Sequence, residues 1–207
     1  MEKHQNLLLI FTRNPELGKC KTRLASKVGD QAALDIYTFL LAHTAQVTRS
    51  VAADKQLYYS ETIWENDIWD NAVYDKRLQT GSDLGARMHQ AFAQGFADGY
   101  ERIIIIGSDL YDIDTATIDI AFLKLDENEV VLGPATDGGY YLLGLSRPQN
   151  HIFKNKAWGT DSVLADTLAD LKHSKVGLLD ERNDVDHYED IADNPAFAPF
   201  LKHMTHD

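Results

Sequence analysis

The stretch from Ile103 to Asp109 reads Ile103-Ile104-Ile105-Ile106-Gly107-Ser108-Asp109. Four consecutive Ile residues leave no polar face, which is typical of a strand buried on both sides of a sheet. The run stops at a glycine, and a carboxylate follows two residues later. Because open α/β sheets bind ligands beyond the carboxyl ends of their strands, Asp109 occupies a position suited to function. Asp109 could equally cap the next helix or turn, since Asp is a preferred residue at both.

Apolar runs and helical patterns follow one another along the rest of the chain, as in an α/β protein. We expect strands over residues 7–11, 56–59, 73–79, 130–134, 176–179 and directly after the glycines at 138–139. We expect helices over residues 29–49 and 112–125, after the turn at 80–83, and from residue 160 or 161. The chain of 207 residues shows no repeat or linker, so residues 1–207 are predicted to form a single domain.

Some side chains in these segments are assigned to packing. The helix after residue 83 is expected to bury Leu84, Met88, Ala91, Phe92 and Phe96. Trp64 and Trp69 lie in an acidic, irregular segment and could stack on a ligand. Aromatic residues more often anchor such a long loop to the core, and we favour that interpretation.

The composition restricts the kinds of partner. The formal net charge is -12, which argues against a nucleic acid or an anionic membrane as the main partner. The apolar run from Leu7 to Phe11 is too short for a signal peptide or a membrane-spanning helix. One cysteine, Cys20, allows no internal disulfide and fits a reducing compartment. We therefore expect a cytoplasmic protein.

A basic loop follows the first predicted strand. Residues 13–23 carry four of the chain's twenty Lys and Arg residues: Arg13, Lys19, Lys21 and Arg23. Such a loop suits a phosphate group, although the spacing is not that of a Walker A motif. The alternative is a loop whose charges simply face water. Arg87, one turn into a predicted helix, could also reach an anion, or could be an ordinary surface residue.

Two further motifs place carboxylates beside predicted strands. Asp137-Gly138-Gly139 separates two apolar runs and permits close approach of a ligand, although it could be only a hairpin turn. Asp184 and Asp186 lie on one side of the chain if the backbone is extended. Oxygen ligands of this kind suit Mg²⁺ or Mn²⁺, although Asp186 could merely cap the helix that follows.

Taken together, the motifs resemble those of a bacterial family of glycosyltransferase-like proteins, DUF2064 or the selenodomain-associated transferase group. The resemblance spans nearly the whole chain and differs at Tyr111, where the family usually has proline. The matching segments are Phe11–Leu24 with its Lys21-Thr22-Arg23-Leu24 sequence, Leu84-Gly85-Ala86-Arg87-Met88, Gly107-Ser108-Asp109, Gly133–Tyr141, Trp158-Gly159-Thr160 and Asp184-Val185-Asp186.

This resemblance implies a GT-A-like, three-layer α/β/α domain with a mostly parallel mixed sheet, the nucleotide-diphospho-sugar transferase fold. It also implies roles for particular side chains. Asp109, Asp184 and Asp186 would hold a divalent Mg²⁺ or Mn²⁺ ion. The phosphates would face Arg13, Lys19, Lys21, Thr22, Arg23 and Arg87, and the acceptor or sugar would face Asp137, Gly138, Gly139 and Tyr140.

The implied function is a metal-dependent transferase that uses an activated nucleotide. A glycosyltransferase with a nucleotide-sugar donor and an unknown acceptor is the first hypothesis, with Asp109, Asp137 and Lys21 as catalytic residues. Lys21 would supply fixed positive charge, and Asp137 would act as general base. Two alternatives remain open: a nucleotidyltransferase that releases pyrophosphate, and a GT-A domain that binds nucleotide without turnover. The oligomeric state is not predicted.

Overall fold

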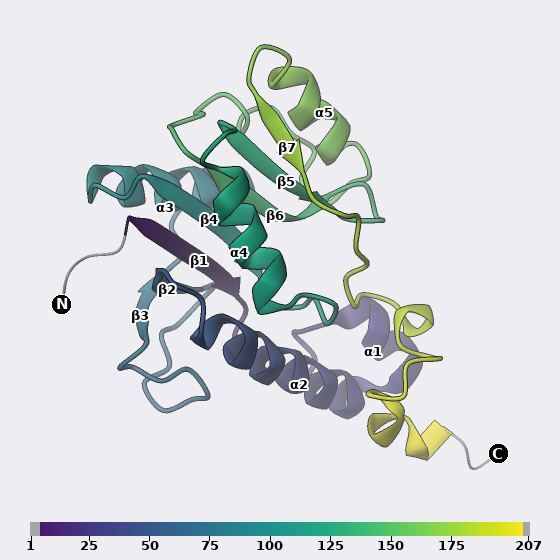
Figure 1. Ribbon diagram of the computed structural model, residues 1–207. Coiled ribbons are helices and arrows are strands. Elements are labelled where there is room, and N and C mark those ends of the chain that lie inside the picture. The colour runs from purple at the N-terminus through teal and green to yellow at the C-terminus, as the bar shows by residue number, and fades with distance from the viewer. Residues whose placement is uncertain (1–4, 205–207) are drawn as a thin grey trace.

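A seven-stranded mixed sheet runs through the computed structural model, which describes residues 5–204 (Figure 1). The strand order is β3-β2-β1-β4-β6-β5-β7. Only β6 runs antiparallel to its neighbours β4 and β5 within this described sheet, which confirms the predicted mostly parallel arrangement. The strands are β1 (Asn6–Thr12), β2 (Asp54–Tyr59), β3 (Tyr74–Leu78), β4 (Arg102–Gly107), β5 (Val130–Pro134), β6 (Tyr140–Leu145) and β7 (Val176–Leu178).

The four isoleucines form β4, which lies in the middle of the sheet between β1 and β6. Ile104 and Ile106 belong to the core on one face, and Ile103 and Ile105 belong to the core on the other. All four side chains are buried, so the prediction of a strand covered on both faces is confirmed. The carboxyl end of β4 therefore opens at the centre of one sheet edge.

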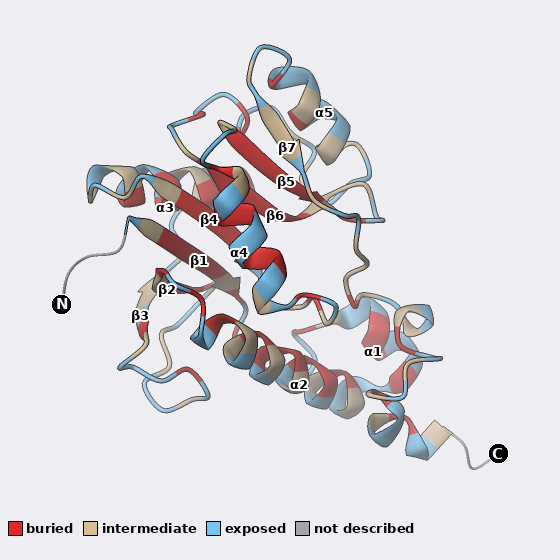
Figure 2. Ribbon diagram, viewed as in Figure 1, coloured by how far each residue is buried: buried red, intermediate tan, exposed pale blue. Residues whose placement is uncertain are grey.

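Helices cover both faces of the sheet. The first core combines the sheet with α2 (Asp30–Arg49) and α4 (Thr115–Lys124), and the second with α3 (Leu84–Ala97) and α5 (Val163–Asp170). Figure 2 shows the buried residues of α2 along the side that faces the protein and the exposed ones along the outside. A third core joins α1 (Thr22–Val28), α2 and residues 185–201. The predicted three-layer α/β/α architecture is thus present.

Some sequence expectations are corrected at the ends of elements. Thr22 and Arg23 begin α1 (Thr22–Val28) and are not part of the preceding loop, because Leu24 and Val28 bury one face of this helix against α2. Leu84 is 44% exposed, since it begins α3 at the edge of the packed region, whereas Met88 and Phe92 are buried as predicted. Trp69 is buried and meets Tyr74 edge-on, so it anchors its loop as expected.

Residues 187–204 form three short 3-10 helices: η1 (Tyr188–Asp190), η2 (Ala198–Phe200) and η3 (Lys202–Met204). The cap of η1 is His187, and the carboxylate of Asp190 accepts bonds from the backbone N–H groups of Asp186 and His187. The Asp186 side chain is therefore not used as a helix cap. Within residues 5–204, no helix is both long enough and apolar enough to cross a membrane.

Asp114 caps α4 and offers a test of this local structure. Its carboxylate accepts bonds from Thr117 N (2.7 Å) and Thr117 Oγ1, and these bonds hold the pKa of Asp114 below its ordinary value. Because the folded-state pKa is depressed, the contribution is present at neutral pH and is lost as pH falls below about 4. Asp114→Ala should lower the free energy of unfolding by about 1 kcal/mol at pH 7 and by less at pH 3.

Urea denaturation at both pH values measures this effect. Asp119→Ala, which removes an exposed carboxylate from the middle of the same helix, is the matched control. Equal losses in the two variants at pH 7 would show that the cap does not stabilise α4.

Candidate functional site

The chain brings three carboxylates together at the carboxyl end of β4. Residues 180–186 continue beside the end of β5, where Thr136 N donates to Arg182 O (3.0 Å) and Arg182 N donates to Pro134 O (3.1 Å). The segment then crosses to the loop after β4, where Val185 N donates to Asp109 O (3.3 Å). Asp109, Asp184 and Asp186 thus approach one another from distant parts of the sequence.

Lys21 lies at the centre of this acidic group. Its Nζ is 2.8 Å from Asp109 Oδ2 and 3.3 Å from Asp186 Oδ1. The Lys21 side chain is 5% exposed, whereas those of Asp109 and Asp186 are 41% and 34% exposed. The ammonium therefore occupies the inner side of the cluster, and the carboxylates lie between it and solvent.

The backbone conformation of Lys21 is as unusual as the burial of its charged side chain. Lys21 adopts a left-handed conformation (φ 49°, ψ 46°) as the N-cap residue that precedes α1. Left-handed backbone is disfavoured for a residue with a Cβ and persists where the surroundings hold it. The two ion pairs of Lys21 supply such a restraint, so the loop conformation and the acidic cluster support each other.

The charges in the cluster shift two carboxyl groups in opposite directions. Burial disfavours the ionised form of Asp109, but the charge and hydrogen bond of Lys21 outweigh burial and lower the pKa of Asp109. Burial, together with the charges of Asp109 and Asp137, raises the pKa of Asp184 to about 6. The site therefore holds more negative charge than Lys21 balances, which favours the binding of a cation.

The other basic residues of the first loop are spread around this cluster. Arg23 Nη1 donates to Asp186 Oδ2 (2.8 Å), and the charge of Arg13 helps to lower the pKa of Asp109. Lys19 instead pairs with Glu16 at 2.6 Å on the surface. Thr22 is exposed as the first residue of α1. Of the predicted phosphate ligands, Lys21 and Arg23 are thus those that contact the acidic cluster directly.

Arg87 takes part in a different set of contacts. Its guanidinium donates to Gln79 Oε1 (3.3 Å) and to Gly81 O (3.3 Å), in the turn before α3. Gln79 in turn donates to Thr12 O (3.1 Å) and Tyr58 O (3.0 Å), at the ends of β1 and β2. Arg87 therefore holds a turn beside the first loop, and its role toward a phosphate stays a prediction.

A buried group of hydroxyls fixes the start of the first loop, and the sequence reasoning missed it. Tyr37 Oη lies 3.3 Å from both Thr12 Oγ1 and Ser108 Oγ, and it accepts a hydrogen bond from Arg13 N (2.9 Å). Ser108 Oγ also donates to Thr12 Oγ1 (3.1 Å). No sequence spacing connects these residues, because they come from β1, α2 and the residue after β4.

The glycine pair after β5 forms the predicted tight turn. Asp137 Oδ1 accepts a hydrogen bond from Gly139 N (2.8 Å), as a hairpin turn would require. Gly138 has a φ of +87°, and its carbonyl accepts from Leu164 N (2.9 Å) at the start of α5. The turn is thereby fixed against α5, and it holds Asp137 where its charge reaches Asp184.

A cavity of about 240 Å³ lies beside the acidic cluster. Asp109, Asp137 and Asp184 line it, together with Gly139 and Tyr140 from the predicted substrate region. The rest of the wall is largely apolar: Phe11, Leu84, Met88, Ile105, Ile106, Leu110, Leu142, Leu143, Trp158 and Val163. The sequence reasoning did not anticipate this cavity, because its wall combines residues from five elements and four loops.

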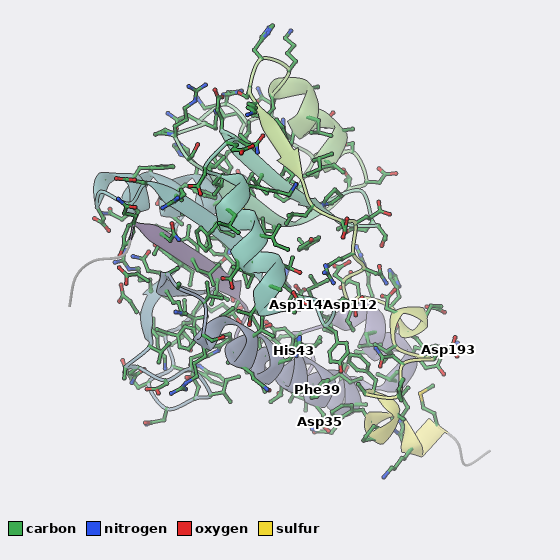
Figure 3. All side chains as sticks on the ribbon, viewed as in Figure 1. Asp35, Phe39, His43, Asp112, Asp114 and Asp193 are labelled. Carbon is green, nitrogen blue, oxygen red and sulfur yellow. The ribbon has the colours of Figure 1, made fainter. Side chains whose placement is uncertain are left out.

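Tyr111, which replaces the usual proline of the resembled family, is part of an aromatic cluster. Its ring stacks on Phe39 with centroids 5.7 Å apart and meets Phe197 edge-on at 5.0 Å. Figure 3 shows Phe39 and His43 on α2, close to the loop that carries Asp112. His43 Nε2 lies 3.1 Å from Ile113 O, so this histidine links α2 to the loop before α4. Tyr111 thus anchors residues 185–201 near the site.

The comparisons with known proteins agree with this architecture. Residues 39–160 match the model of a family described as an uncharacterized protein conserved in bacteria, DUF2064. The chain belongs to the DUF2064 family. No functionally curated protein matches the sequence of this DUF2064 protein.

Several solved structures share the fold of the DUF2064 chain. A candidate nucleotide-diphospho-sugar transferase from Desulfovibrio desulfuricans G20 has 29% identity and a TM-score of 0.86, over 93% of this chain and 90% of that one. A cytidylyltransferase from Leptospira borgpetersenii has 12% identity and a TM-score of 0.59, over 90% and 83%. Rv0371c from Mycobacterium tuberculosis H37Rv, solved in complex with manganese, has 16% identity and a TM-score of 0.56, over 96% and 98%. The chain thus has the nucleotide-diphospho-sugar transferase fold.

The carboxylates of the DUF2064 chain fit a divalent ion in their chemistry. Asp109 and Asp184 offer hard oxygen ligands, and burial, followed by the negative charges of Asp109 and Asp137, raises the pKa of Asp184. Among residues 5–204, no three His, Cys, Asp or Glu side chains converge on one ion position. An ion here would therefore need ligands from substrate or water, which is usual for Mg²⁺.

Replacing Lys21 tests the charge balance of the DUF2064 site. Lys21→Met keeps the buried alkyl volume but leaves Asp109 and Asp186 without their shared ammonium. Because both carboxylates are partly exposed, we expect the free energy of unfolding to fall by only about 1–2 kcal/mol at pH 7. Urea denaturation measures the change, and Lys27→Met, an exposed lysine of α1, is the control. A similar loss in both variants would contradict a stabilising role for the Lys21 ion pairs.

Proposed function

We propose that this protein is a metal-dependent glycosyltransferase that uses a nucleotide-sugar donor. The observation that carries the proposal is the position of Lys21 between Asp109 and Asp186, beside a cavity that Asp137 and Asp184 also line. Cationic and anionic groups alternate there at the carboxyl edge of a sheet, as a diphosphate with its counter-ion requires. The similarity to the Desulfovibrio protein, itself a candidate nucleotide-diphospho-sugar transferase, supports the same activity class.

The donor diphosphate is proposed to lie along the first loop. Arg13, Lys19 and Arg23 are exposed basic side chains of this region and are available to a ligand from solvent. Lys21 is nearly fully buried and already fixed by two ion pairs, so its charge needs no reorganisation during a reaction. A divalent ion held by Asp109 and Asp184 would neutralise charge on the leaving diphosphate.

The acceptor is proposed to enter from the side of Asp137. Its carboxylate is exposed, lines the cavity and is oriented by the hydrogen bond from Gly139 N. A carboxylate in this position can accept a proton from an attacking hydroxyl group. Gly139 and Tyr140 form the adjoining part of the cavity wall, where a bound acceptor would contact them.

A thermal-shift panel tests the proposal. It compares UDP, GDP, CTP, GTP and common nucleotide sugars, each with and without Mn²⁺. A ligand at about a hundred times its Kd stabilises by roughly 2.7 kcal/mol, a shift of about 5–10 °C for a chain of this size. We expect a Mn²⁺-dependent shift with a nucleoside diphosphate or a nucleotide sugar.

The other outcomes of the panel would each contradict part or all of the proposed function. A shift with triphosphates alone would indicate nucleotidyl transfer with release of pyrophosphate. A shift that did not depend on Mn²⁺ would contradict the metal dependence of the proposed reaction. If no nucleotide or nucleotide sugar produced a shift, the protein would have no donor substrate for a transfer reaction.

A further inference from the structure

The wall of the cavity beside Asp109 is apolar apart from one side. The sheet contributes Phe11 and Leu143 to this wall, and α3 contributes Met88. The other side is covered by Trp158, in the loop before α5, and by Val163, the first residue of α5. Leu84 also lines the cavity, yet it is 44% exposed, so the apolar surface continues to the outside. The carboxylates of Asp109, Asp137 and Asp184 supply the polar side.

The hydroxyl groups of the wall are already occupied or out of reach. Thr160 Oγ1 donates to Ala157 O (2.8 Å), and Tyr141 Oη donates to Asp180 O (3.1 Å). The hydroxyl of Tyr140 is buried out of contact with water-sized molecules. Outside the carboxylates, the wall therefore offers few free donors to the hydroxyl groups of a sugar ring, and a hydroxyl group left unpaired against an apolar wall disfavours binding.

The wall is also rigid at its aromatic side. A Cβ added to Gly85 would lie 2.6 Å from Trp158 Nε1 and 2.5 Å from Phe153 O, so the indole packs directly on the backbone of α3. A preformed apolar cavity binds apolar guests well, because little order is lost on binding. An apolar cavity of roughly 150 Å³ accommodates benzene, so the larger volume here has room for a substituted ring.

We infer that this cavity binds the apolar body of an acceptor alcohol, with its hydroxyl group directed to the carboxylates of Asp137 and Asp109. The inference rests on the proposed glycosyl transfer and names its acceptor class: a neutral alcohol of a single ring or a short alkyl chain. Three carboxylates on the polar side disfavour an anionic acceptor, because like charges repel in a partly enclosed site.

The transfer step balances with these groups. The alcohol oxygen forms the new bond to the anomeric carbon of the sugar, and the bond from that carbon to the diphosphate oxygen breaks. The nucleoside diphosphate leaves with the bonding electron pair. The hydroxyl proton passes to the carboxylate of Asp137, and no oxidant or reductant takes part.

Ligand-observed fluorine NMR with 4-fluorobenzyl alcohol tests the inference on the whole chain without nucleotide. We expect saturable binding that hexan-1-ol displaces, and no saturable binding of 4-fluorobenzoate. Glucose should not displace the probe. Leu84→Asp places a charge at the exposed part of the apolar wall and should weaken binding at least about fivefold. It should fold normally, since an acidic residue is favourable in the first turn of a helix.

Leu123→Asp is the control, because Leu123 is 67% exposed on α4 and does not line the cavity. Equal binding by wild type and both variants, or displacement by glucose, would overturn the inference. Absence of alcohol binding in a protein that still shows the Mn²⁺-dependent nucleotide shift would overturn the acceptor class alone. Alcohol binding without any nucleotide shift would contradict the proposed function, and the alcohol could then not be assigned as its acceptor. A product with the mass of the hexosylated alcohol would support both.

Discussion

Asp109→Asn should reduce the turnover of this DUF2064 protein on the order of 10³-fold while the protein stays folded. The substitution keeps the shape of the side chain but removes the charge that pairs with Lys21 and, in the proposed function, helps to hold the divalent ion. Loss of one electrostatic contact in an active site commonly costs a factor of about 10²–10³, and loss of a metal ligand adds to this. Release of nucleoside diphosphate from the donor identified by the thermal-shift panel is the measurement.

Asp119→Asn is the matched control for charge, because Asp119 is an exposed aspartate on α4 away from the cavity. It should leave turnover within about twofold of wild type, as is usual for surface changes. If Asp109→Asn retained Mn²⁺-dependent nucleotide binding of wild-type strength, the assignment of Asp109 to the metal would be wrong. Turnover by this variant at the wild-type rate would exclude Asp109 from the reaction.

Gly138→Ala should produce the largest loss of stability among the glycine substitutions at left-handed turns. The added Cβ would lie 2.2 Å from Asp161 O and 2.5 Å from Asp161 Cα, and backbone atoms cannot move away as a side chain does. The left-handed φ adds a further cost for a residue with a Cβ. We expect the free energy of unfolding to fall by about 3 kcal/mol, which lowers Tm by roughly 6–12 °C.

Gly29→Ala separates the two contributions to that loss. Gly29 has a φ of +85°, close to the +87° of Gly138, but a Cβ added there meets nothing within 4 Å. With its ψ of 155°, Gly29 also has a backbone conformation that only glycine adopts readily, so its substitution should cost the conformational part alone, about 1–2 kcal/mol. Calorimetry on both variants gives the comparison, and equal changes in Tm would show that contact with Asp161 contributes nothing.

The fold could be predicted from the sequence where periodicity is strong. Four isoleucines define β4, and apolar spacing of three and four residues defines α2. The helix α1 was missed because it is only 7 residues long and begins within a loop that contains proline and glycine. Its helical state depends on burial against α2, which is a tertiary effect and leaves little trace in local sequence.

The sequence predicts which residues could belong to the candidate site, but it does not predict how they are arranged in space. The sequence indicates Asp109, Asp184 and Asp186 as possible ligands, since each follows a strand. It does not reveal that Lys21 lies between two of them, because that contact joins residues 165 positions apart. Nor does it reveal the Thr12–Tyr37–Ser108 hydroxyl group, which exists only once three elements have packed. Roles in catalysis and in metal binding remain predictions for all of these residues.

The contact between Lys21 and Asp186 also determines when the protein acquires its site during synthesis. A ribosome makes the strands β1 to β7 before it makes Asp184 and Asp186, so a nascent chain can form its sheet while Lys21 still lacks one of its partners. Residues 185–201 must then dock on α1 and α2, through contacts such as that between Phe39 and Phe197. Long-range contacts of this kind form late and slowly. The acidic cluster around Lys21 is therefore complete only after the last segment of the chain has docked.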